Sequence, residues 1–228
     1  MRKLFGFTLA EVLITLGIIG IVAALTMPTL IGNATATRYK THFKKTLSVL
    51  NQAVKLSAAN DDIDFATDWE YGDGLSPMET VLTKNVKGIT NVKSEYEEKY
   101  EKNWNKFLSV LTGHDYIYGD FDLAYLMPDG SLFASDNSTC SLPEGMSVRD
   151  FLLTEDIDGR NNFCIGFIDV NGFNPPNKEV TCADGTVSGD IDEACTLAKD
   201  KINDIFPVVY FNQTVVPATN AAKAALIQ

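Results

Sequence analysis

The sequence GFTLAEVLI, from Gly6 to Ile14, decides the fold of this chain because it opens a long apolar run. Between Leu4 and Ala36 the only charged side chain is that of Glu11. About 20 apolar residues span the roughly 30 Å hydrocarbon core of a bilayer, and Val12 to Ile31 is long enough. A lone carboxylate in such a segment costs about 2.5 to 3.5 kcal/mol and needs a partner. Basic residues flank the run, Arg2 and Lys3 before it, Arg38 and Lys40 after it.

This combination of a short basic leader, a glycine, Phe-Thr-Leu and a glutamate before an apolar run resembles the type IV pilin family. That family includes pilus subunits and the pseudopilins of type II secretion. The match is close from Lys3 to Leu13, strong over about the first 35 residues and loose beyond them. In the family a membrane-embedded prepilin peptidase cuts after the glycine, and the new amino terminus is N-methylated. The resemblance implies a cut between Gly6 and Phe7, methylation of Phe7 and an assembly role for Glu11.

The chemistry of Glu11 admits two interpretations. Cleavage would leave an α-amine on Phe7, whose pKa near 8 keeps it mostly charged. A glutamate on an adjacent subunit would neutralise that cation and remove two unpaired charges from a low-dielectric place. Alternatively, Glu11 pairs only with the N-terminus of its own helix, which favours a nearby carboxylate.

Two other kinds of segment begin in a similar way. One is a secretory signal peptide cut after Ala34-Thr35-Ala36, but the apolar region is longer than the usual 7 to 15 residues and contains Glu11. The other is a signal anchor that is never cut. The leader from Met1 to Gly6 favours the pilin interpretation over both.

The charge distribution predicts orientation and excludes one class of partner. The chain has 228 residues and a net charge of −11. All charged residues among the first 55 are Lys or Arg except Glu11, so the rest of the chain is markedly acidic. An acidic head argues against binding of nucleic acid by bulk charge. Arg2 and Lys3 favour a cytoplasmic amino terminus, although basic residues also follow the segment. The resemblance implies a single-pass inner-membrane protein with its head outside the cytoplasm, in an extracellular or periplasmic filament after assembly.

All four cysteines, Cys140, Cys164, Cys182 and Cys195, lie in the acidic part of the chain. An even number of cysteines in an exported domain indicates disulfides, here two. Three pairings exist, and sequence proximity favours Cys140–Cys164 with Cys182–Cys195. Free buried thiols are the alternative. No C-x-x-C spacing occurs, so a zinc site has little support.

The membrane helix is expected to continue beyond the bilayer. Six residues at spacings of 3 or 4 mark one helix face: Tyr39, Phe43, Leu47, Leu50, Val54 and Ala58. We therefore predict one helix from Phe7 to about Ala59, near 80 Å long at 1.5 Å per residue, kinked or loosened at Pro28 and Gly32. Its basic run just beyond the membrane can meet lipid phosphates or acidic neighbouring subunits, or form a solvated face: Arg38, Lys40, His42, Lys44 and Lys45.

The predicted fold is α+β, with the amphipathic half of the helix packed on an antiparallel sheet of about four strands. The chain divides into a leader (1–6), a transmembrane or filament-core helix (7–31), an amphipathic extension (32–59), a helical insertion (60–119) and a head domain (120–228). The insertion is predicted from two capping boxes, at Ser76–Glu79 and Ser94–Glu97. Alternating residues from Phe121, a turn at Pro128–Gly130 and an apolar run up to Val170 predict the first strands.

Metal binding and catalysis have little support. Asp169 and Asp156 each begin a calcium-like D-x-N/D-G sequence, but position 12 is Val180 and Phe167 in place of the glutamate that an EF-hand needs. Some pseudopilins bind calcium in a different C-terminal loop, so the resemblance admits a calcium site near Asp169, Asp200 or Asp204 as the less favoured interpretation, and we expect no metal. The alternative is Asx-turn chemistry. No catalytic motif occurs, so we expect no enzyme and, calcium aside, no cofactor.

The sequence therefore predicts a structural subunit of a type IV pilus or type II secretion filament. Its expected partners are prepilin peptidase, other pilin or pseudopilin subunits, the inner-membrane assembly platform and membrane lipid. The alternative is a minor pilin or a membrane-anchored binding module whose head domain recognises a ligand.

Overall fold

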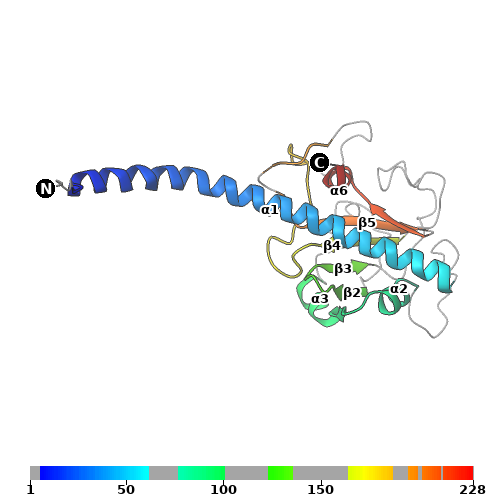
Figure 1. Cartoon of the computed structure of the whole chain (residues 1–228). Coiled ribbons are helices and arrows are strands. Elements are labelled where there is room, and N and C mark those ends of the chain that lie inside the picture. The colour runs from blue at the N-terminus through cyan, green and yellow to red at the C-terminus, as the bar shows by residue number, and fades with distance from the viewer. Residues whose placement is uncertain are drawn as a thin grey trace.

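A long helix projects from an α+β head, as predicted (Figure 1). The computed structural model describes residues 6–61, 77–100, 123–135, 164–186, 195–199, 202–211 and 213–227. The described helices are α1 (Leu9–Asp61), α2 (Pro77–Asn85), α3 (Lys93–Tyr100) and α6 (Asn220–Ile227). The described strands are β1 (Thr90–Asn91), β2 (Leu123–Leu126), β3 (Leu132–Ser135), β4 (Cys164–Asp169), β5 (Ile205–Phe211) and β6 (Thr214–Pro217).

Helix α1 runs for 53 residues without interruption. It begins at Leu9 rather than Phe7, because Thr8 takes the capping position ahead of the first turn. Pro28 lies inside it, so the predicted loosening does not break the helix, which is only gently bowed (Figure 1). The predicted stripe faces the head: five of its six residues are buried and Ala58 is half-buried.

The strands form one antiparallel six-stranded sheet in the order β1-β2-β3-β4-β5-β6, rather than the four or so strands predicted. Short turns join β2 to β3 and β5 to β6. In the first of these turns the carboxylate of Asp129 accepts hydrogen bonds from the backbone N–H and the hydroxyl of Ser131. Strand β1 was not predicted. It lies inside the segment expected to be a helical insertion, and it pairs Thr90 with Leu126 and Asn91 with Tyr125 of β2.

The main core lies between α1 and one face of the sheet. Phe43 of α1 stacks on Phe206 of β5 with ring centroids 4.3 Å apart. Four buried alanines of α6 belong to the same core: Ala221, Ala222, Ala224 and Ala225. The opposite face of the sheet is also buried, and there Tyr96 of α3 contacts Phe167 of β4 with ring centroids 6.1 Å apart.

One glycine of the sheet sits where no side chain fits. A Cβ on Gly166 of β4 would lie 2.8 Å from the carbonyl oxygen of Ala134 and 3.2 Å from the ring of Phe133. Real Cβ atoms essentially never approach backbone so closely. Gly166 therefore leaves room for the Phe133 ring and for the backbone of β3 beside β4.

Polar contacts also fasten α1 and α2 to the sheet. Thr46 of α1 bonds Ser131 at 3.0 Å in a buried position, and Lys45 pairs with Asp129 at 3.2 Å. The Tyr125 hydroxyl of β2 donates to Glu79 of α2 at 2.8 Å. Burial and this bond raise the pKa of Tyr125 to about 12.

Asn51 of α1 closes the outer edge of the sheet. Its amide nitrogen donates to the carbonyl oxygen of Val215 at 2.8 Å, and its oxygen accepts from the Val215 N–H at 3.0 Å. The hydroxyl of Thr214 donates to the same oxygen at 3.2 Å. The side chain thus takes the place of a neighbouring strand along β6, whose free edge would otherwise be a template for pairing with another chain.

Candidate assembly site at the N-terminal helix

Thr8 and Glu11 form a reciprocal capping box at the start of α1. The backbone N–H and the hydroxyl of Thr8 donate to Oε2 of Glu11 at 2.8 and 2.7 Å. The Glu11 N–H donates back to the Thr8 hydroxyl at 3.3 Å. Such a box satisfies N–H groups that the first helical turn leaves without partners. In the single chain, Glu11 therefore engages its own helix N-terminus, which is the second of the two interpretations of this residue.

The role of Thr8 was not predicted, although the sequence contains the pattern for it. Thr8-Leu9-Ala10-Glu11 has the T-x-x-E spacing of a capping box. The two residues bracket one helical turn, so local sequence is sufficient to place this contact.

The predicted cut site lies just before the helix. Gly6 and Phe7 are exposed and lie outside α1. The Phe7 side chain is 88% exposed, and a Cβ on Gly6 would meet no atom within 4 Å. The peptide bond between them is therefore accessible in a non-helical stretch.

The first half of α1 exposes its apolar side chains. Within the described ranges one helix is long and apolar enough to cross a membrane, and none of its most apolar window is buried in the head. Apolar residues point in every direction around the axis, so a single buried stripe cannot account for them. The exposed large side chains between Leu9 and Ile31 are Leu9, Val12, Leu13, Ile14, Leu16, Ile18, Ile19, Ile21, Val22, Leu25, Met27, Leu30 and Ile31.

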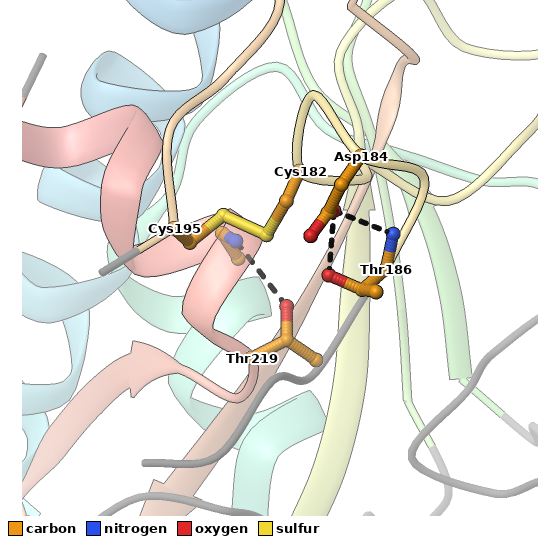
Figure 2. The surroundings of a disulfide bond; sticks show 6 residues. Cys182, Asp184, Thr186, Cys195 and Thr219 are labelled. Atoms are coloured by element: carbon orange, nitrogen blue, oxygen red, sulfur yellow. Dashed lines mark hydrogen bonds between the residues drawn. A yellow bond between two sulfur atoms is a disulfide. The ribbon is translucent and has the colours of Figure 1, made fainter. Parts of the chain in front are cut away.

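A disulfide joins Cys182 and Cys195 across 13 residues, the pairing that sequence proximity favoured (Figure 2). The two ends also bond through their backbones, since the Ala183 N–H donates to the Thr196 carbonyl at 2.7 Å. The carboxylate of Asp184 organises the adjacent turn by accepting from the N–H and hydroxyl of Thr186 (Figure 2). Cys164 is also disulfide-bonded. Its expected partner Cys140 lies outside the described residues.

The residues proposed for calcium organise a loop against α1. Oδ1 of Asp169 accepts from the Asn171 N–H at 3.2 Å, which is an Asx turn. The two carboxylate oxygens of Asp204 accept from the N–H groups of Asn177 and Lys178, each at 2.9 Å. Burial raises the pKa of Asp204, although these N–H groups oppose the shift.

Asn171 then joins this loop to α1, because its amide donates to the Tyr39 hydroxyl at 3.0 Å. No group of three or more metal-ligating side chains is found in the described ranges, and Asp200 lies outside them. The carboxylates of Asp169 and Asp204 accept hydrogen bonds from backbone N–H groups, and calcium binding near them stays a prediction.

The comparisons with known proteins concern the N-terminus. Residues 1–27 match the family model described as the prokaryotic N-terminal methylation motif. No curated protein and no solved structure is significantly similar to the chain. The matched residues include Gly6, Phe7 and Glu11, together with the first turns of the apolar helix. The motif and the apolar helix fit membrane anchoring. The chain therefore carries, in its first 27 residues, the signature of the type IV pilins and pseudopilins.

Proposed function

We propose that this chain is a structural subunit of a type IV pilus or type II secretion filament. Prepilin peptidase cuts it between Gly6 and Phe7, and the mature subunit waits in the inner membrane with its head outside the cytoplasm. An assembly platform then moves it into a filament. The observation that carries the proposal is the apolar half of α1, which is exposed on all sides and lies largely within the residues that match the methylation motif. Such a surface needs either lipid or other helices around it.

The carboxylate of Glu11 has one oxygen for capping its own helix and a second oxygen for binding an adjacent subunit. Thr8 occupies Oε2, whereas Oε1 accepts no hydrogen bond from the described residues. The charged α-amine of Phe7 on an adjacent subunit is a suitable donor to Oε1. One such pair in each subunit contact fixes the axial offset between neighbours, because misplacing it leaves two buried charges without partners.

Processing is tested by intact mass. The exported protein is expected to lack Met1 to Gly6 and to carry one methyl group on Phe7. A bulky residue in place of Gly6 is expected to leave uncut precursor in the membrane, because the peptidase needs close backbone approach there. A mature protein that begins at Thr37 would establish a signal peptide instead.

Assembly is tested with Glu11→Ala and Glu11→Gln. Both remove the charge, and Ala is the best helix former, so we expect processed, membrane-resident protein that makes few or no filaments. Thr8→Ala is the matched control, because it removes the capping partner and keeps the carboxylate. If charge pairing between subunits is the function of Glu11, Thr8→Ala still assembles. Equal loss of filaments in all three variants would show that Glu11 acts only as a helix cap.

A further inference from the structure

The outer half of α1 exposes a row of basic side chains on the face opposite the head. We call Arg38, Lys44, Lys45 and Lys55 the basic stripe; all four are exposed. No acidic residue occurs between Glu11 and Asp61. Within the described part of the chain, only Lys45 of the stripe forms an ion pair, with Asp129. Polar side chains continue the same face at Thr41, Ser48 and Gln52.

The rest of the molecule has the opposite charge. Residues 1–60 contain seven Lys or Arg and one acid, which gives them a net charge of +6. Because the whole chain has a net charge of −11, residues 61–228 carry a net charge of −17. The stripe lies on the solvent-facing side of α1, since the opposite face of the helix is buried on the sheet (Figure 1), and Lys45 at its edge reaches back to Asp129. One molecule therefore presents a basic helix face and an acidic head, and these two surfaces are complementary between copies.

The length of the helix separates the stripe from lipid. At 1.5 Å per residue, Arg38 lies about 10 Å beyond Ile31, Lys44 and Lys45 about 20 Å and Lys55 about 36 Å. Charges separated by more than the Debye length, about 8 Å at physiological salt, are largely screened when exposed to solvent. Headgroup phosphates next to Ile31 are therefore much nearer to Arg38, at about 10 Å along the helix, than to Lys55, at about 36 Å, where screening is nearly complete. A protein surface alongside the helix is the partner that matches the whole stripe.

We propose that the basic stripe is the docking surface for the acidic head of a second copy of this chain. The inference rests on the proposed filament function and names the contact outside the apolar core. Leu56, 50% exposed beside Lys55, supplies an apolar contact at the same surface. In a staggered filament the outer half of α1 of one copy would lie against the head of another copy. Each added copy would then pair the charges of Arg38, Lys44 and Lys55, which form no ion pair with any described residue of the monomer.

The first test is Lys44→Glu with Lys55→Glu in the full chain, expressed with its assembly machinery. Both lysines are exposed and lack an ion pair with any described residue, so the folded subunit is expected to keep its melting temperature and its membrane level. Filaments recovered by shearing are expected to fall about tenfold or more, since attraction becomes repulsion at two positions. The control is Lys87→Glu with Lys199→Glu, two exposed lysines of the head, which gives the same net charge and is expected to assemble.

Normal filament yield from the stripe variant, or equal loss from the control, would overturn the inference. Absence of filaments from the wild type would instead overturn the proposed function. The second test needs no variant: a carbodiimide that joins lysine to carboxylate is applied to wild-type filaments. We expect Lys44 or Lys55 linked to an Asp or Glu in the covalent dimer band and not in the monomer band. If these lysines react only within the monomer, and the variant loses binding only to phosphatidylglycerol vesicles, the stripe is a lipid surface and the inference is wrong.

Discussion

Replacing Asn51 by leucine tests whether one side chain fastens α1 to the edge of the sheet. The change keeps a similar volume and removes three hydrogen bonds to β6, two with Val215 and one with Thr214. Each such bond contributes about 1 kcal/mol net, and an unsatisfied buried group costs about 1 to 3 kcal/mol. Because Asn51 is half-buried and water reaches part of the site, we expect a loss of about 3 kcal/mol in the free energy of unfolding. For a chain of this size that lowers the melting temperature by about 6 to 12 °C.

The assay is thermal unfolding of the full chain in detergent, followed by near-UV circular dichroism. The matched control is Gln52→Leu, because Gln52 is exposed on the same turn and, among the described residues, bonds only the Ser48 hydroxyl. Leucine favours a helix more than either residue it replaces, so helix propensity cannot produce the expected loss. Hydrogen exchange at the Val215 amide is expected to be slow in the wild type and fast in Asn51→Leu. Equal melting temperatures for the two variants, with the Val215 amide still protected, would refute the role given to Asn51.

Three further predictions concern the head. Gly166→Ala places a Cβ 2.8 Å from a backbone oxygen, and we expect this overpacking to lower the free energy of unfolding by about 1 to 3 kcal/mol and the melting temperature with it. Gly20→Ala is the control, because its Cβ meets no atom within 4 Å, and we expect it not to lower the melting temperature. The pKa of Tyr125 is raised to about 12, so the stabilisation it contributes is complete below about pH 10 and is lost as the pH rises through about 12. Ultraviolet titration is expected to show one tyrosine that ionises at unusually high pH and that is missing in Tyr125→Phe. Replacing Cys182 and Cys195 together by serine opens the loop that they close across 13 residues, and we expect the free energy of unfolding to fall by roughly 3 kcal/mol. Denaturant unfolding measures this loss, and an unchanged midpoint would contradict the role given to this disulfide.

Much of the candidate site could be predicted because its information is local. The capping pattern at Thr8 and Glu11 spans one helical turn, and the apolar run after it needs only composition to be identified as a membrane helix. The turn at Asp129 and the start of α2 at Pro77 follow from residue types whose backbone preferences hold in any context. Nearness along the chain also favoured the disulfide between Cys182 and Cys195.

The sequence by itself determined the long helix, its buried stripe, the hairpin around Asp129 and the N-terminal motif, since each depends on period, composition or adjacency. Only the tertiary structure decided which distant groups meet. Asn51 reaches Val215 across 164 positions, and Asn171 reaches Tyr39 across 132. Strand β1 has two residues, too few for an alternating pattern, and exists because β2 offers it an edge. Such contacts depend on how elements pack in space, and no local preference of the chain encodes them.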